Sequence, residues 1–234
     1  MLVHRSSVVI TVAAGVWLAS IVQAAITETS GTASQSSPGN ESRATRKVEL
    51  EQATFGLGCY SCAEAIFERL KGVKSVAVGY SGGTVKNPTD KQIGSGKTGH
   101  AEVVHIEYDP NIVSYDQLLE VFWKMHDPTT LNRQGKNVGP QYRSVIFYHS
   151  DKQRELAKHY KEKLSASHIY ADPIVTEIAE YTKFYPADKS HQGFFRLNPK
   201  DEYCTLVIQP KVAEFERVFA NKVKPSQAVT ASKR

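Results

Sequence analysis

Segments with the pattern of strands alternate with segments with the pattern of helices between residues 47 and 223. In HAEVVHIEYDP (100–110), Val104 and Ile106 fall on one side of an extended chain and their neighbours fall on the other, which is typical of a β-strand. SYDQLLEVFWKMHDP (114–128) instead begins with a serine that can cap a helix and ends at a proline. This alternation predicts an α+β fold in which helices pack on a sheet.

We predict a two-layer α/β sandwich, with helices packed on a mixed sheet and with long loops. The predicted strands lie within 47–58, 72–83, 100–110, 142–150 and 173–180, and the predicted helices are 60–70, 114–128 and 150–166. Residues 84–99 form a long predicted loop, and loops of this length are usually functional or mobile. The prediction is therefore one domain, residues 47–223.

The first 24 residues have the order of a secretory signal peptide. Arg5 supplies a positive start, residues 8–22 are apolar and uncharged, and Ala24 offers a small-residue cleavage site. An uncleaved membrane anchor is the alternative, because the apolar run is near the short limit for a membrane span. We expect cleavage after Ala24 and export to a periplasm-like or extracellular compartment.

Two polar segments flank the predicted domain. Residues 25–46 are rich in Ser, Thr and Gly, and residues 224–234 have the same character, so neither can bury enough apolar surface to order itself. We interpret them as a disordered linker and a flexible tail. The net charge is +5, but basic and acidic residues are interleaved and no basic-aromatic cluster stands out. We expect a monomer that binds no nucleic acid.

The chain has three cysteines, Cys59, Cys62 and Cys204, which are too few for a disulfide framework. Cys59 follows Gly-Leu-Gly and begins a predicted helix. Backbone N–H groups at a helix start favour an anion, so this thiol is expected to have a lowered pKa and to be a nucleophile as the thiolate. The alternative for each cysteine is a small buried apolar residue.

The cysteine pattern alone leaves three classes of chemistry open. Cys59-Tyr-Ser-Cys62 has the spacing of a thioredoxin-like exchange centre. The Trp-Cys-Gly-Pro residues that are usual in that motif are not found here. The pair is also half of a zinc site, but Cys204 has no second ligand close to it in the sequence. The third class is a peroxide or sulfoxide redox thiol with a distant resolving cysteine.

Several further stretches, in order along the chain, resemble one family. They are GVKSVAVGYSGG, NPT, SGKTGHAEVVHIEYDP, VFWKMHDPTT, RQGKNVGPQYRSVIF and YCTLVIQPKVAEF. Together these motifs are similar to the A-type peptide methionine sulfoxide reductases, over about residues 51–219. The resemblance implies a ferredoxin-like core and thiol-dependent reduction of methionine S-sulfoxide, free or in proteins, with no bound cofactor or metal and with an external thioredoxin-type dithiol as reductant.

The resemblance also implies roles for residues. Cys59 matches the nucleophile, and Glu102 matches the acid that protonates the sulfoxide oxygen. Asp127 and Tyr142 match residues that hold a water and the substrate oxygen, and Cys204 matches a resolving cysteine. A carboxylic acid that keeps its proton near neutral pH requires burial, and Glu102 lies on an apolar strand face where burial is expected. Without the resemblance, Glu102, Asp127 and Tyr142 read as an edge-strand carboxylate, a helix-end turn and a core aromatic.

Cys62 is a second candidate for the resolving thiol, and three further residues are candidates for the substrate pocket. Tyr60 and Ser61 stand where the family has Phe-Trp, and His191 lies in a later stretch that resembles the family's surface near the site. Asp90 replaces a family tyrosine after Asn-Pro-Thr. These differences predict a substrate pocket with changed affinity. The runner-up function is a weakened family member that binds oxidised proteins, and a thioredoxin-like exchange protein comes next.

Overall fold

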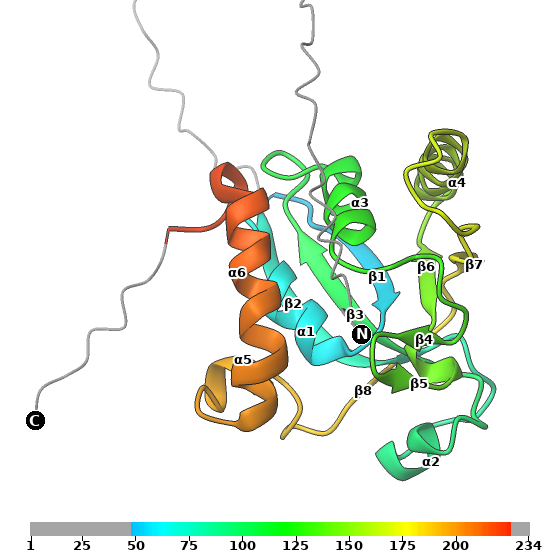
Figure 1. The fold of residues 1–234 in the computed structure, drawn as a ribbon, viewed down its shortest axis with the longest axis vertical. Coiled ribbons are helices and arrows are strands. Elements are labelled where there is room, and N and C mark those ends of the chain that lie inside the picture. The colour runs from blue at the N-terminus through cyan, green and yellow to red at the C-terminus, as the bar shows by residue number, and fades with distance from the viewer. Residues whose placement is uncertain (1–47, 226–234) are drawn as a thin grey trace, which may run out of the picture. The chain divides into compact units, whose positions relative to one another are not determined.

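The computed structural model describes residues 48–225, and its largest element is a six-stranded mixed sheet (Figure 1). The strands are β1 (Glu51–Leu57), β2 (Val73–Ser81), β3 (Ala101–Tyr108), β4 (Arg133–Gln134), β5 (Asn137–Val138), β6 (Ser144–Tyr148), β7 (Glu177–Glu180) and β8 (Phe184–Pro186). The helices are α1 (Tyr60–Phe67), α2 (Asp90–Gly94), α3 (Tyr115–Lys124), α4 (Asp151–Ala166), α5 (Phe194–Leu197) and α6 (Gln209–Val218), with short turns η1 (Pro140–Tyr142), η2 (Cys204–Ile208) and η3 (Ala220–Lys222).

The order of the strands confirms the predicted α+β sandwich and its ferredoxin-like core. The sheet runs β7-β6-β1-β3-β2-β8, and only the β6–β7 pair is parallel. The chain follows β1-α1-β2-β3-α3-β6, and the four strands of this unit lie in the sheet in the order β6-β1-β3-β2 with every neighbour antiparallel. This is the β-α-β-β-α-β arrangement of ferredoxin-like folds.

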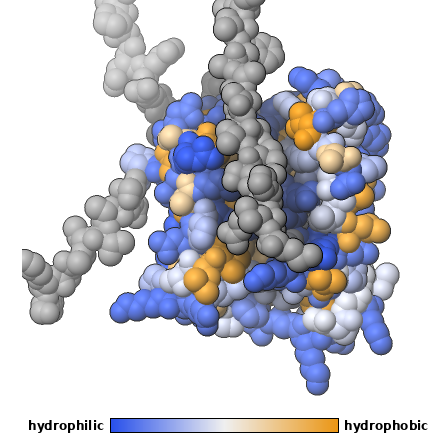
Figure 2. Space-filling model, in the orientation of Figure 1, coloured by the Kyte–Doolittle hydropathy of each residue, from blue (hydrophilic) through white to orange (hydrophobic). Residues whose placement is uncertain are grey.

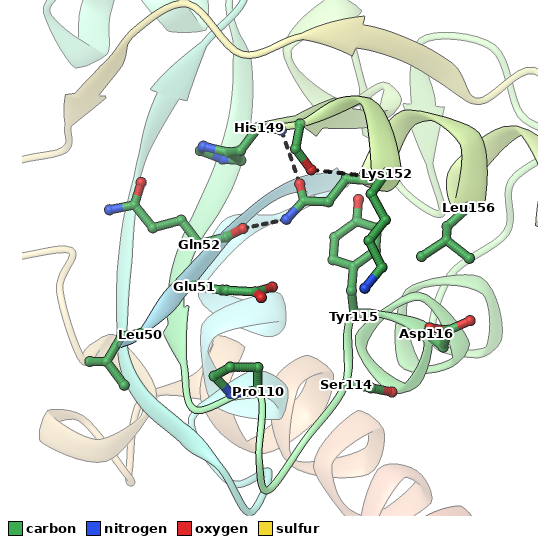
Figure 3. A pocket seen from close by; sticks show the side chains of 12 residues that line it. Leu50, Glu51, Gln52, Pro110, Ser114, Tyr115, Asp116, His149, Lys152 and Leu156 are labelled. Carbon is green, nitrogen blue, oxygen red and sulfur yellow. Dashed lines mark hydrogen bonds between the residues drawn. The ribbon is translucent and has the colours of Figure 1, made fainter. Parts of the chain in front are cut away.

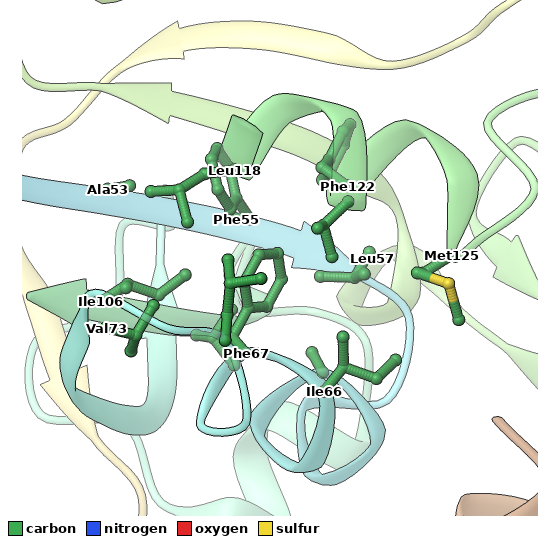
Figure 4. Packing of buried hydrophobic residues seen from close by; sticks show 14 of the residues in the cluster. Ala53, Phe55, Leu57, Ile66, Phe67, Val73, Ile106, Leu118, Phe122 and Met125 are labelled. Atoms are coloured by element: carbon green, nitrogen blue, oxygen red, sulfur yellow. The ribbon is translucent and has the colours of Figure 1, made fainter. Parts of the chain in front are cut away.

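The main core lies between the sheet and helices α1 and α3 (Figure 4). Phe55 of β1 and Ile106 of β3 face Phe67 of α1 and Phe122 of α3, and all four side chains are fully buried. The other side of β3 belongs to a second cluster, in which Val103 packs with residues of β6. The predicted alternation of β3 is thus confirmed, and both faces of the sheet are covered.

Capping side chains define the starts of two helices as the sequence indicated. Ser114 accepts a hydrogen bond from the backbone N–H of Gln117 at the start of α3, and Ser150 accepts one from the backbone N–H of Gln153 at the start of α4. The predicted loop 84–99 is wrong in one respect, because it contains the short helix α2. Thr89 and Gln92 form a reciprocal capping box there.

Helix α1 is buried on all sides, because the C-terminal segments pack over it. Ala63, Ile66 and Phe67 face the main core, whereas Cys62 and Ala65 belong to a separate cluster with η2 and α6. Helix α6 and the turn η2 also contact α1 directly. The residues at the start of α1 therefore lie between the edge of the sheet and the C-terminal part of the chain.

The part of the surface drawn in Figure 2 is mostly hydrophilic, with separate apolar patches. No helix within residues 48–225 is long and apolar enough to cross a membrane. The predicted signal peptide and linker, residues 1–46, and most of the predicted tail, 224–234, lie outside the described residues. Those three boundaries stay predictions.

Candidate active site

The turn between β1 and α1 places Cys59 at the start of a helix, as the sequence predicted. Gly58 has φ +91°, a backbone conformation that favours glycine, and a Cβ at this position would lie 2.5 Å from Cγ of Gln134. Cys59 is half-buried and occupies the N-cap position of α1. The glycine therefore allows both the sharp turn and the close approach of Gln134, a residue that sequence reasoning missed.

Hydrogen bonds lower the pKa of Cys59 to about 6. The largest contribution is a hydrogen bond from the Cys62 thiol, and burial of the sulfur acts in the opposite direction. The Tyr203 hydroxyl and the backbone N–H groups of Cys62 and Ser61 also stabilise the thiolate. Cys59 is thus ionised at neutral pH, and the partner thiol of Cys62 keeps its proton because its pKa is raised by the same hydrogen bond.

Tyr203 lies over the cysteine pair from the C-terminal side. Its hydroxyl is 3.9 Å from Sγ of Cys62 and also hydrogen-bonds Cys59, and its pKa is raised by burial and by the nearby thiolate. Asn137 of β5 is a further hydrogen-bond partner of this hydroxyl. Sequence reasoning missed Tyr203, although its position next to Cys204 was a signal that it would come close to Cys59.

Glu102 of β3 lies beside Cys59 and carries a raised pKa of about 8. Burial is the main cause, the negative charge of the Cys59 thiolate adds to it, and the N–H of Tyr60 opposes it. That N–H donates to Oε2 of Glu102 at 3.2 Å, so the first residue of α1 fixes the carboxyl group next to the nucleophile. At neutral pH the site therefore holds a thiolate and a neutral carboxylic acid together.

Tyr142 ends the turn η1 on the same side of the site. Its pKa is raised by burial first and then by the charges of Glu102 and Cys59. These charge interactions place the Tyr142 hydroxyl within electrostatic reach of both groups. The structure thus brings Cys59, Glu102 and Tyr142 together from three separate parts of the chain.

Cys204 is fully buried and lies in the same apolar cluster as Cys62, with Cys59 packed against that cluster. It begins the π-helical turn η2, and its pKa is raised by burial. The three cysteines are free thiols that lie on two segments far apart in sequence. Cys204 is thus in the neighbourhood that a resolving cysteine requires, but it is protonated and closed off from solvent.

A hydrogen-bonded wall, which we call the polar wall, is formed by Tyr60, Tyr80, Asp90 and His191. The Tyr80 hydroxyl donates to Oδ1 of Asp90 at 2.6 Å, and Nδ1 of His191 lies 3.1 Å from Oδ2 of Asp90. Nδ1 of His191 is also 3.0 Å from the Tyr60 hydroxyl, which is 3.5 Å from the Tyr80 hydroxyl. The structure therefore brings the predicted pocket residues Tyr60 and His191 into direct contact and joins His191 to Asp90, and it adds Tyr80, which sequence reasoning missed.

Two polar side chains, the half-buried Gln192 and the buried Glu64, hold His191 in place. The amide of Gln192 accepts from the N–H of Val78 at 2.9 Å and donates to the carbonyl groups of Val78 and Ala187. Glu64 of α1 accepts from the N–H of Gly193 at 2.8 Å. The segment that carries His191 is thus attached both to β2 and to the helix that begins at Cys59.

Asp127 contacts the site only indirectly, and Ser61 contacts it through its backbone. Oδ1 of Asp127 accepts hydrogen bonds from the N–H and the hydroxyl of Thr129, while its backbone pairs with the side-chain amide of Gln134 that covers Gly58. Ser61 is 6% exposed and directs its backbone N–H, rather than a large side chain, to Cys59. The predicted role of Asp127 in holding a water and that of Ser61 in binding substrate stay predictions.

A cavity of about 450 Å³ lies elsewhere in the structure (Figure 3). It lies between the start of β1 and the first turns of α3 and α4, and its walls contain none of the cysteines. Within residues 48–225, no three His, Cys, Asp or Glu side chains are grouped so that they could hold a metal ion. The reactive groups are therefore those around Cys59.

Comparison with known proteins decides the family. The sequence profile described as "Peptide methionine sulfoxide reductase" matches residues 51–223. The chain belongs to the peptide methionine sulfoxide reductase family. It is 52% identical over 171 residues to a "Peptide methionine sulfoxide reductase MsrA" of Natronomonas pharaonis, which covers 73% of this chain and 96% of the relative. It is 53% identical over 176 residues to "Peptide methionine sulfoxide reductase MsrA 1" of Rhodopirellula baltica, covering 75% of this chain and 91% of the relative.

Solved structures of this reductase family share the fold. The "Methionine sulfoxide reductase A of Corynebacterium diphtheriae" superposes with a TM-score of 0.59 at 34% identity, covering 67% of this chain and 78% of that one. Mxr1 from Saccharomyces cerevisiae in reduced form superposes with a TM-score of 0.61 at 29% identity, covering 68% of this chain and 91% of that one. The chain is thus an oxidoreductase, a peptide-methionine (S)-S-oxide reductase, which converts methionine S-sulfoxide to methionine. The resemblance drawn from the sequence is confirmed.

Proposed function

We propose that this reductase works through Cys59 as nucleophile and Glu102 as general acid. The Cys59 thiolate attacks the sulfoxide sulfur while Glu102 transfers its proton to the sulfoxide oxygen. The protonated oxygen then moves from the substrate sulfur to Sγ of Cys59 as the bond between the two sulfur atoms breaks, which leaves methionine and a Cys59 sulfenic acid. The substrate sulfur is reduced by two electrons and the cysteine sulfur is oxidised by two, so the step is balanced.

A single observation supports this proposal: Tyr60 connects Cys59, whose pKa is lowered, to Glu102, whose pKa is raised. Tyr60 follows the thiolate in the chain and donates to the neutral acid at 3.2 Å, so one rigid helix start positions both. Sulfoxide oxygen is a poor leaving group until it is protonated, and a carboxylic acid with a pKa near 8 still has its proton at pH 7. Tyr142 is proposed to hold the same oxygen through its hydroxyl.

A second thiol then resets the nucleophile. The sulfenic acid condenses with a thiol to give a disulfide and water, and an external dithiol reduces that disulfide by exchange. Cys204 and Cys62 are the candidates, because both lie in the apolar cluster against which Cys59 packs. The two electrons of each turnover must come from outside the chain, and we propose a thioredoxin-type dithiol as their source.

The test is the stoichiometry of methionine release. The reduced full chain, freed of reductant, is mixed with the S or R sulfoxide of N-acetyl-methionine, and the N-acetyl-methionine formed is counted per enzyme. We expect one product molecule from the S epimer, none from the R epimer, and continued release from the S epimer after a dithiol is added. Equal release from both epimers, or binding of the S epimer without release, would contradict the proposal. The second outcome would support the weakened binding protein instead.

We also propose that the chain is exported after cleavage at Ala24 and acts as a monomer. The order of charged, apolar and small residues in 1–24 supports export. Mass spectrometry of the protein from its natural host tests it: a mature N-terminus at Ala25 is expected, and retention of residues 1–24 would contradict cleavage. Light scattering measures the mass in solution, and a monomer should have the mass of one mature chain.

A further inference from the structure

The polar wall contains a carboxylate that the reaction described above does not use. Asp90 accepts from the Tyr80 hydroxyl through Oδ1 and faces Nδ1 of His191 through Oδ2. Its side chain is 35% exposed, and an ionised carboxylate has about four acceptor sites, so two contacts leave capacity for a further donor. Among the described residues its partners are a neutral hydroxyl and an imidazole, neither of which is a fixed cation.

The wall connects Asp90 to the reacting groups. His191 joins Asp90 to the Tyr60 hydroxyl, and the N–H of Tyr60 holds the acid Glu102. The negative charge of Asp90 also raises the pKa of both Tyr60 and Glu102, which shows that its electrostatic effect extends into the site. The other three members of the polar wall, Tyr60, Tyr80 and His191, have aromatic rings, so Asp90 is the carboxylate of the wall.

The position is held rigidly. Gln192 and Glu64 fix the segment that carries His191, and the capping box of Thr89 and Gln92 fixes the helix that begins at Asp90. A charge held in place in a half-buried pocket selects for an opposite charge at a matching distance on the ligand. The wall therefore has the properties of a specificity element as well as those of a packed surface.

We propose that Asp90 is a specificity-determining residue that binds an ammonium group of the substrate close to its sulfoxide. This inference rests on the proposed function and names the class of substrate that this site favours. Two sources have the required chemistry: the α-ammonium of free methionine sulfoxide, and the side chain of a lysine next to the sulfoxide in a peptide. The free amino acid carries its ammonium on the same residue as the sulfoxide.

The experiment compares matched substrates in the full chain. The first pair is free methionine S-sulfoxide against its N-acetyl amide, and the second is an acetylated peptide amide with Lys or with Gln next to the sulfoxide. The variant Asp90→Asn removes the charge, keeps an oxygen that can accept from Tyr80, and places an amide N–H₂ where Oδ2 faces Nδ1 of His191. We expect the ratio of kcat/KM for the cationic over the neutral member to fall about three- to fivefold, the scale of a partly exposed ion pair.

The matched control is Asp151→Asn. Asp151 is also the first residue of a helix, α4, and its side chain is 83% exposed, so this variant removes the same charge from the same type of position away from the site. It should leave both ratios as in the wild type. Raising the ionic strength should lower the wild-type ratio toward that of Asp90→Asn, because salt screens the charge.

The two pairs separate the sources, since a change confined to the first pair identifies the free amino acid and a change confined to the second identifies lysine-flanked sulfoxides. An active Asp90→Asn enzyme with unchanged ratios would overturn the inference. An equal loss on cationic and neutral substrates would also overturn it, because the neutral member has no ammonium to lose. Absence of turnover by the wild type on every substrate would instead contradict the proposed function.

Discussion

Cys59 is the proposed nucleophile and Cys204 is one of two candidates to resolve it, and the environments of the two thiols are opposite. Cys59 is half-buried at a helix start, and four hydrogen-bond donors lower its pKa to about 6. Cys204 is fully buried in an apolar cluster, and burial raises its pKa. The first is prepared to attack from the resting structure, and the second is protonated and shielded.

The difference shows that preorganisation is reserved for the first chemical step. A thiolate that meets the substrate must be accessible, whereas a resolving thiol is needed only after the sulfenic acid has formed. Keeping Cys204 protonated also protects it from oxidants until Cys59 has reacted. Substitutions at each thiol and at the residues around it test this difference.

Replacing the prepared thiol should abolish activity. Cys59→Ser has no thiolate to attack the sulfoxide, so we expect kcat to fall about 10⁴-fold or more, the scale of losing a nucleophile. Steady-state assay with the S epimer and a dithiol measures it. Cys62→Ser is the matched control, because it removes a thiol one helical turn away and should retain turnover. Substantial turnover in Cys59→Ser would move the nucleophile elsewhere.

Removing the neutral acid beside Cys59 should cost about 10²-fold or more in kcat. Glu102→Gln keeps the shape of the carboxyl group but cannot supply its proton. In the wild type, kcat/KM should fall below pH about 6, where Cys59 becomes a thiol, and above pH about 8, where Glu102 loses its proton. The variant should lose the alkaline limb. Glu107→Gln on the same strand is the control, and an unchanged alkaline limb in Glu102→Gln would place Glu102 outside the chemistry.

Replacing the shielded thiol should affect recycling and spare the first turnover. Cys204→Ser should still release one methionine per enzyme, because Cys59 and Glu102 are intact, but its reduction by a protein dithiol should be slower. Cys62→Ser should slow recycling less if Cys204 is the principal resolving residue. Mass mapping of the oxidised wild type should then show Cys59 bonded to Cys204. A Cys59–Cys62 bond as the sole product would assign the role to Cys62.

The smallest effect is expected from the hydroxyl that covers the cysteine pair. Tyr203→Phe removes one donor to the Cys59 thiolate, so the pKa of Cys59 should rise by about one, and the acid limb of the pH profile should move upward with it. Thiolate absorbance against pH measures this change. Tyr160→Phe removes a hydroxyl bonded to Asp116, away from the site, and should leave the titration unchanged. A Cys59 pKa that stays near 6 in Tyr203→Phe would show that hydrogen bonds from Cys62 and the backbone are enough to stabilise the thiolate.

The sequence predicted those parts of the fold that have periodic patterns. The alternation in β3 and the capping serines of α3 and α4 each identified an element that the structure confirms. Strands β4 and β5 are two residues long, and β8 has three, so they have no period to detect. The helix α2 was not predicted, because it has only five residues and lies in a polar loop, which is too short a segment to show a helical period.

The site was predictable where one short motif carries the chemistry. Cys59 follows from a glycine turn before a helix, and Glu102 follows from its strand face together with the family resemblance. The family resemblance singled out Tyr60, Asp90 and His191, but their contacts in the polar wall were not predictable. Asp90 and His191 lie about a hundred residues apart, and the pairing of β8 with β2 brings their segments together. Tyr203 contacts Cys62 across 141 residues, and its position next to Cys204 was the one signal in the sequence for that contact.

The segment that carries Cys204 is held at both ends. Gly193 is bonded to Glu64 on one side, and on the other Val223 pairs with Leu70 while the N–H of Lys224 donates to the carbonyl of Arg69. A thiol on such a closed segment searches a small volume, so its effective concentration at the Cys59 sulfenic acid is high. Fast capture shortens the lifetime of the sulfenic acid and leaves little time for a second oxidation to the irreversible sulfinic acid. If Cys204 resolves Cys59 as proposed, the closed segment gives the enzyme resistance to inactivation by the same oxidants whose damage it repairs.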